Sequence, residues 1–281
     1  MRIHELKYSN TNTYLIEGEK GKLIFDTGWA GTFPAFCRAL GQIDVPLQSI
    51  DYILISHYHP DHMGIAQEIA KKGPVLVVPD VQADYLHTAD NVFAKEERGN
   101  TGSRSAFVPI DDSKVYKITL KESGDVLNKI GLSGRILHTP GHSDDSISLY
   151  LDSGELFVGD LNPLYELALH KGTQTEESWK MLLALKPKII YYGHAKSATM
   201  PDATATEGLD AVATVQSTAL PDLYDLTSRI ITLIDKGCDV NKICKKTGAD
   251  ERFIQDVMRM YLTHQGISIR GILDRIEIKG R

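Results

Sequence analysis

"LISHYHPDHMG", residues 54–64, places three histidines and one aspartate within six positions of a chain that has ten histidines in all. If the chain is extended up to His59, the imidazoles of His57 and His59 point to the same side and can bind one metal ion. The proline that follows is typical of the first turn of a helix. Asp61 and His62 then point in other directions, which suits a second ion nearby. The segment predicts two adjacent metal half-sites where a strand ends and a helix begins.

Three later segments each end an apolar run with a potential ligand near a glycine. They are "HTPGHSDDS" with His142, "LFVGD" with Asp160 and "IYYGH" with His194. Each residue alone has an ordinary interpretation as a turn residue, a cap or a structural histidine. Together with residues 54–64 they complete the nitrogen and oxygen set that two divalent ions require. We expect one ion to be bound by His57, His59 and His142, the other by Asp61, His62 and His194, and Asp160 to bridge them.

Composition favours a small-molecule enzyme. The net charge of −6 and the pI near 5.9 offer little electrostatic attraction to nucleic acid or to an anionic membrane. The three cysteines are widely spaced and odd in number, which indicates reduced thiols rather than disulfides. No signal peptide and no apolar run of about 18 residues is visible. We expect a cytoplasmic protein without a membrane partner.

Strands and helices alternate along the first two hundred residues. Residues 12–19 and 20–28 are alternating runs separated by charged and glycine residues, which indicates an antiparallel hairpin. Helical spacing predicts helices at 33–43 and 175–186. This alternation fits an α/β protein with two sheets and helices outside them. Further strands are expected at 50–57, 73–79, 135–140, 146–152, 155–160 and 188–194.

The pattern divides the chain into residues 1–205, a catalytic domain, and residues 206–281, a small, mainly helical C-terminal region. Residues 80–113 are a polar excursion, irregular or helical, and a candidate flap over the site. After a linker-like stretch near residue 200, an amphipathic helix and two short helices around a glycine turn are expected. Residues 267–281 read as a small β-hairpin. The region resembles a winged helix or a helical cap.

Residues 1–200 resemble the metallo-β-lactamase superfamily. The resemblance rests on "LIFDTG", "SHYHPDHMG", "TPGHSDDSISL", "FVGD" and "YYGH", in the order and spacing of family members. It implies a four-layer αββα sandwich with two metals at one edge of the sheets, and the same seven ligands. Asp26 of "DTG" matches a family position near the site, where it would orient the ligand loop or cap a turn.

The site predicts a dinuclear metal-dependent hydrolase. Two cations lower the pKa of a bridging water toward 7, so a bridging hydroxide attacks a small-molecule ester, thioester or lactone while Asp61 orients it. Zn²⁺ suits these ligands best, and Fe or Mn also fits. Tyr165 and His170 are candidate proton donors to the leaving group, and ordinary packing is their alternative. His138 is expected to support the site or to be structural.

The ligand set is similar to those of glyoxalase II and of lactonases of the superfamily. The alternative is a phosphodiesterase or ribonuclease of the same superfamily acting on nucleic acid. Residues 222–281 carry eleven Lys/Arg and nine Asp/Glu, a net of +2, which is a weak phosphate-binding surface. A cap over the substrate pocket, or a homodimer contact, is therefore favoured for this region. A protein that only stores metal fits poorly with ligands drawn from separate segments.

Overall fold

The computed structural model describes residues 1–93, 107–200, 221–263, 269 and 272–273. The chain forms two compact units. The first comprises Met1–Leu161 and Gly172–Ala203, and the second Asn162–Lys171 and Thr204–Arg281. The domain boundary expected at residue 205 stays a prediction.

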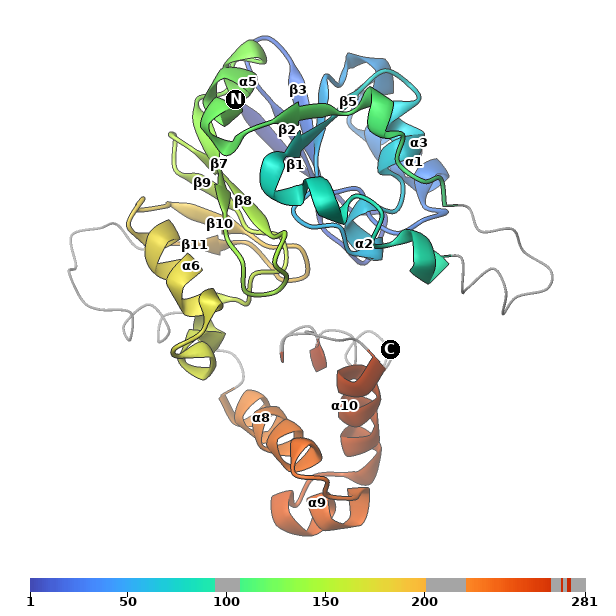
Figure 1. Ribbon diagram of the computed structural model, residues 1–281. Helices are drawn as coiled ribbons and strands as arrows, with labels where there is room; N and C mark the ends of the chain where they lie inside the picture. The colour runs from blue at the N-terminus through green and yellow to red at the C-terminus, as the bar shows by residue number, and fades with distance from the viewer. Residues whose placement is uncertain (94–106, 201–220, 264–268, 270–271, 274–281) are drawn as a thin grey trace, which may run out of the picture. The chain divides into compact units, whose positions relative to one another are not determined.

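The first unit contains two mixed β-sheets (Figure 1). The six strands of the first sheet lie in sequence order, β1 to β6, and β3, β4, β5 and β6 run parallel. The five strands of the second lie in the order β11-β10-β9-β8-β7, with β9 and β10 parallel. The first sheet is formed by β1 (Arg2–Leu6), β2 (Thr13–Glu17), β3 (Lys22–Phe25), β4 (Tyr52–Leu54), β5 (Val75–Pro79) and β6 (Tyr116–Ile118). The second is formed by β7 (Gly134–His138), β8 (Ile147–Leu151), β9 (Glu155–Phe157), β10 (Ile189–Tyr191) and β11 (Ala198–Thr199).

Alternation along each strand gives the first sheet two apolar faces. Tyr14 and Ile16 of β2 belong to the core between the sheets, together with Phe157 of β9. Leu15, between them in sequence, belongs instead to the core formed with the helices, as does Ile24 of β3. Because successive side chains of a strand point to opposite faces, a fully apolar strand is buried on both sides. This pattern produces the two inner layers of the sandwich.

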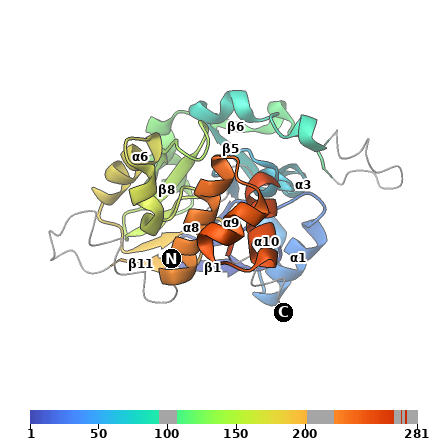
Figure 2. The same cartoon turned by 90° about the horizontal axis from the view of Figure 1, so that it is seen from below.

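Helices cover the outer faces of the two sheets. Apolar residues of α1 (Phe33–Gln42) and α3 (Ala66–Ala70) pack on the first sheet. On the second sheet, the hydroxyl of Tyr150 in β8 donates to the Leu185 carbonyl just after α6 (Gln174–Leu183). Figure 2 shows α3 on the side of β5 and α6 on the side of β8. The remaining short helices are α2 (Pro60–Met63), α5 (Ser123–Lys129), η1 (Leu47–Ser49), η2 (Asp80–Tyr85), η3 (Asp112–Lys114), η4 (Leu120–Glu122) and η5 (Leu164–His170). The predicted four-layer α/β sandwich is confirmed.

The second unit is mainly helical. Besides η5, its described residues form the longer helices α8 (Pro221–Asp235), α9 (Val240–Thr247) and α10 (Glu251–Thr263). Gly248 ends α9 with a φ of 71°, a conformation that glycine adopts without strain, and Ile230, Ile243 and Ile254 form a common core. The two short helices around a glycine turn are confirmed.

Three predicted segments lie partly or wholly outside the described residues. The described part of residues 80–113 is mostly helical, including 90–93, and its centre lies outside the described residues, as does the expected linker from residue 201. Most of the hairpin expected at 267–281 also lies outside them, and its three described residues are helical. None of the described helices combines the length and hydropathy needed to cross a bilayer.

Candidate metal centre

All seven predicted ligands lie in segments that follow strands, five of them in loops and two, Asp61 and His62, in α2. Residues 57–62 follow β4, and His142 lies between β7 and β8. Asp160 follows β9 and His194 follows β10, its parallel neighbour. The carboxyl ends of parallel strands lie at one edge of a sheet, which is a common place for a ligand site. The fold therefore brings together residues up to 137 positions apart.

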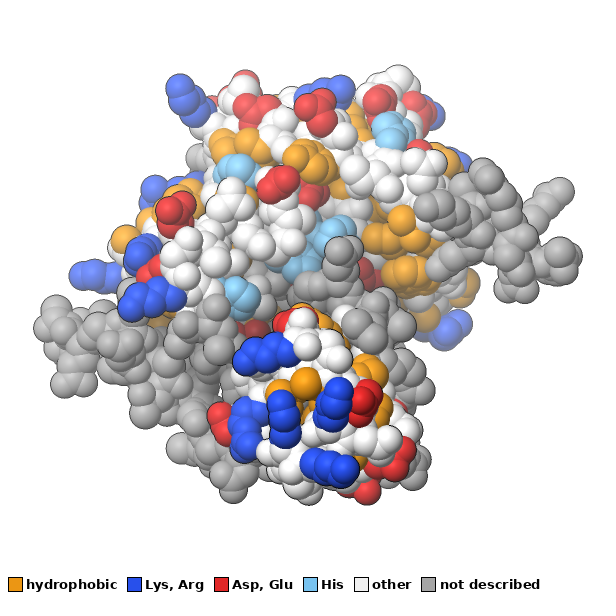
Figure 3. Space-filling view, turned by 60° about the horizontal axis from the view of Figure 1, so that its bottom comes forward, with side chains coloured by type: hydrophobic (Ala, Val, Ile, Leu, Met, Phe, Trp, Pro, Cys, Tyr) orange, Lys and Arg blue, Asp and Glu red, His pale blue; other side chains and the backbone are white. Residues whose placement is uncertain are grey.

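The first group consists of three imidazole nitrogens. His57 Nε2 and His142 Nε2 lie 3.0 Å and 3.1 Å from His59 Nδ1. His57 is buried, whereas His59 and His142 are only partly buried. Histidine side chains reach the surface together on one face of the molecule (Figure 3). This geometry brings together the three residues expected to bind one ion.

The second group combines imidazoles with carboxylates. Asp61 Oδ2 lies 3.0 Å from His194 Nε2, and these two residues form a candidate metal group with His62. Asp160 lies between the groups. Its Oδ1 is 3.3 Å from His62 Nε2, and its Oδ2 is 3.7 Å from His142 Nε2 and 3.4 Å from His194 Nε2.

Buried hydrogen bonds determine which nitrogen of each histidine faces the site. Ser56 Oγ donates to Asp26 Oδ2 at 2.9 Å, so the 3.0 Å contact from His57 Nδ1 requires that nitrogen to carry the proton. His62 Nδ1 likewise donates to Asp26 Oδ2 at 2.9 Å. Nε2 of both His57 and His62 is then free to bind a metal. Asp26 thus contacts the site as the resemblance implied, and it orients His62 directly.

Two further contacts orient the second group. His194 Nδ1 donates to the Asn10 carbonyl at 3.0 Å, which directs the unprotonated Nε2 at the carboxylates. Thr11 Oγ1 donates to the Asp61 carbonyl at 2.7 Å and holds the first turn of α2. The loop between β1 and β2 therefore supports the site.

Two buried polar atoms indicate that these histidines and aspartates fit a metal. His62 Nε2 and Asp160 Oδ1 have no hydrogen-bond partner among the described residues, although they lie 3.3 Å apart. An unpaired buried polar atom is costly, and both atoms are good ligands for a divalent ion. The residues fit the divalent metals that the predicted ligand set requires.

The electrostatics of the histidines differ between the two groups. Burial, reinforced by His62, lowers the pKa of His57 well below its usual value. Burial also lowers the pKa of His142 to about 4, against the opposing effect of Asp160. For His62, burial is outweighed by Asp160 and Asp26, which raise its pKa well above the usual value. The carboxylates therefore concentrate negative charge around His62, where a divalent cation would also be stabilised.

Glycines beside the ligands allow close approach of the strands. A Cβ at Gly159 would collide with Ser56 Oγ, and one at Gly193 would collide with Asp160 Oδ1. The Gly193 Cβ would also lie 2.9 Å from His62 Cε1. The glycines noted in the sequence are thus required by packing at the site.

The remaining predicted residues lie elsewhere. His138 ends β7, and its Nε2 donates to the Asp144 carbonyl at 2.7 Å in the loop that carries His142. Tyr165 and His170 belong to η5 in the second unit. Their role as proton donors stays a prediction.

Ser56, Asn10 and Thr11 were not predicted from the sequence as supporting residues, nor were two others. The backbone N–H of Tyr58, between the first two ligands, donates to Asp145 Oδ2 at 2.7 Å. Gln82 Nε2 donates to the carbonyls of Ile55 and Asp145, both at 3.0 Å. Asp145 and Gln82 both tie the β4 loop to the loop of His142. The doubled aspartate of "HSDDS" was the available signal for the first, and none marked Gln82.

Comparison with known proteins identifies the family. The metallo-beta-lactamase superfamily profile matches residues 7–194, more than half of the chain, and the chain belongs to this superfamily. A beta-lactamase-like protein 2 homolog of Drosophila melanogaster is 29% identical over 199 residues, which cover 68% of this chain and 60% of that protein. An atrochrysone carboxyl ACP thioesterase of Claviceps purpurea is 27% identical over 159 residues, covering 54% of this chain and 40% of that protein.

A metallo-beta-lactamase family protein of Thermus thermophilus has a similar fold. Its crystal structure superposes with a TM-score of 0.54 at 16% identity, covering 99% of this chain and 92% of that one. This likeness supports the fold alone. The chain spans less than two thirds of the length of the fruit-fly and fungal relatives.

Proposed function

We propose that the chain is a dinuclear metal-dependent hydrolase of small-molecule esters, thioesters or lactones. The observation that carries the proposal is the convergence of three imidazole nitrogens with two unpartnered buried atoms, His62 Nε2 and Asp160 Oδ1. The first ion is assigned to His57, His59 and His142, the second to Asp61, His62 and His194, with Asp160 shared. When bound, two such ions supply a water of lowered pKa and a Lewis acid for the substrate oxygen.

The protein itself orients the reacting groups. Hydrogen bonds fix which ring nitrogen of each histidine faces the site. Ser56 contacts His57, Asp26 contacts His62, and the Asn10 carbonyl contacts His194. His57 can therefore bind a metal without a prior proton transfer. Asp61, held by Thr11 at its backbone, can accept a hydrogen bond from an attacking water and aim it. Tyr165 and His170 are the proposed donors to the leaving group. The relative named as an ACP thioesterase supports a thioester within this class.

Metal analysis joined to a substrate panel tests the proposal. We expect two equivalents of Zn²⁺, Fe or Mn per chain, with Zn²⁺ favoured. The chelated protein should lose hydrolysis of esters, thioesters and lactones and regain it on metal addition. Asp61→Asn should abolish turnover, whereas Asp152→Asn, at the far end of β8, removes the same charge and should not. Hydrolysis by a metal-free protein would contradict the proposal.

The second candidate is a nucleic-acid phosphodiesterase. It is favoured by five exposed cations on or beside α8 and α9 in the second unit. They are Arg229, Lys236, Lys242, Lys245 and Lys246. Figure 3 shows basic side chains, in blue, on this unit. RNA binding measured at two salt concentrations separates the candidates, because phosphate contacts weaken steeply with salt. We expect RNA binding to be absent or independent of the salt concentration.

The proposed cytoplasmic location is supported by the cysteines. All three are free thiols in the structure. Cell fractionation tests this location.

A further inference from the structure

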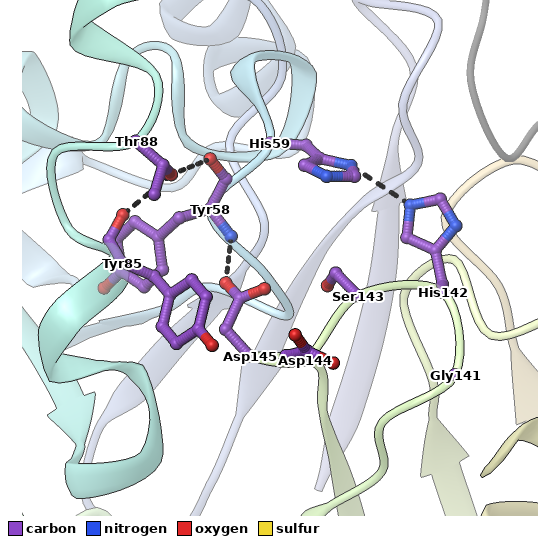
Figure 4. A pocket seen from close by; sticks show the side chains of 9 residues that line it. All are labelled: Tyr58, His59, Tyr85, Thr88, Gly141, His142, Ser143, Asp144 and Asp145. Carbon is purple, nitrogen blue, oxygen red and sulfur yellow. Dashed lines mark hydrogen bonds between the residues drawn. The ribbon is translucent and has the colours of Figure 1, made fainter.

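A cavity of about 370 Å³ opens beside the first histidine group (Figure 4). Its floor includes His59 and His142, two of the proposed ligands. One wall is formed by Tyr85 and Thr88, from η2 and the turn after it, and the other by residues 143–145. All of these residues belong to the first unit. A substrate held at the metals can therefore extend into this cavity.

The charges of the cavity wall are negative. Asp145 is buried, and its carboxylate accepts the backbone N–H of Tyr58. Asp144 is exposed, and its carboxylate has no hydrogen bond or ion pair with any described residue. Figure 4 shows the Asp144 side chain between Asp145 and Ser143. No lysine or arginine is found among the described residues that line the cavity.

Aromatic rings complete the surroundings. Tyr58, Tyr85 and Asp145 all line the cavity. A carboxylate next to aromatic faces attracts a cation and repels an anion. Ions held by the histidines would act on the reacting carbonyl, so the charge of the wall would govern the group at the far end of the substrate.

We propose that this cavity binds a cationic group of the substrate, of the ammonium or quaternary ammonium class, and that Asp144 determines this specificity. The inference rests on the proposed hydrolase function. It predicts discrimination against substrates that carry an anionic group at this position.

Two matched substrate series test the proposal with the metal-loaded full chain. The first consists of p-nitrophenyl esters whose acyl chain ends in a trimethylammonium, a tert-butyl or a carboxylate group. The second consists of thioacetates whose thiol part ends in the same three groups. These groups are close in size and differ in charge. In the series whose variable end enters the cavity, kcat/KM should be about five- to tenfold higher for the cation than for the neutral isostere.

Variants assign the preference to one residue. Asp144→Asn should bring the ratio of cation to neutral isostere close to one, and Asp144→Lys should favour the carboxylate. Asp152→Asn, which removes a carboxylate at the far end of β8, should keep the wild-type ratio. A ratio near one in both series for the wild type, or a ratio that Asp144→Asn leaves unchanged, would overturn the inference. Absence of metal-dependent turnover of the neutral compounds would instead overturn the hydrolase proposal, and this inference with it.

Discussion

Replacing Asp26 by Asn tests whether the buried carboxylate determines the metal-binding nitrogen of His62. Asp26 Oδ2 accepts from His62 Nδ1 at 2.9 Å, and Oδ1 accepts the Ser56 N–H at 2.7 Å. Asparagine preserves the shape and tolerates the φ of 60° at this position. It keeps the Ser56 contact through its oxygen but presents an N–H₂ to His62. His62 must then accept at Nδ1, which puts a proton on the Nε2 that faces the site.

The expected magnitude follows from the loss of one orienting contact. Such contacts change metal affinity by about 10- to 100-fold, or about 1.4–2.8 kcal/mol. A competition titration against a chromophoric chelator should show this loss for one of two ions. The other ion should lose less affinity, because Asp26 acts on His57 only indirectly, through Ser56 Oγ.

Two controls make this result interpretable. Urea unfolding of the metal-free variant checks that the fold is intact, and Asp152→Asn checks the effect of one lost charge. Unchanged affinity for both ions in a folded Asp26→Asn protein would refute the role assigned to Asp26.

Three further predictions concern packing and charge. Gly193→Ala should weaken metal binding, measured by titration, at least tenfold, because the added Cβ displaces the Asp160 carboxylate. An unchanged affinity would contradict the close packing of Gly193 against Asp160. Phe157→Ala, fully buried between the sheets, should lower the free energy of unfolding by about 3–5 kcal/mol in urea, and a loss below 1 kcal/mol would be inconsistent with its burial. The side chain of His87 is half exposed, and its hydrogen bonds to Asp90 and Asp112 raise its pKa. His87→Gln should therefore cost about 0.5 kcal/mol below pH 6.5, and the difference should vanish as the pH rises through the raised pKa; a constant difference would argue against it.

The residues of the candidate metal centre could be picked out from the sequence because their signals are local. Four of them lie within residues 57–62, and each of the others stands next to a glycine at the end of an apolar run. The glycines are informative because a side chain at Gly159 or Gly193 would collide with the site.

The supporting residues could not be predicted because their roles depend on tertiary contacts. Asp145 reaches the backbone of Tyr58 across 87 positions, and Gln82 reaches Asp145 across 63. Nothing in a local pattern indicates which buried polar side chain will meet a given backbone group. The family resemblance, in contrast, did place Asp26 near the site.

The same distinction applies to the fold. The strands with continuous apolar runs were predicted, whereas β1, β6 and the two-residue β11 were not. Arg2–Leu6 is mostly exposed or half-buried and carries two charges, and Tyr116–Ile118 has only three residues. Short strands of this kind are determined by pairing with a neighbour, here β2 and β5.

The separation of the ligands along the chain has a consequence for folding. His57 and His194 are 137 positions apart, so the complete set of ligands exists only in the folded chain. Bound ions would therefore stabilise the folded state by their binding free energy. The thermal stability of the sandwich would then depend on the supply of metal.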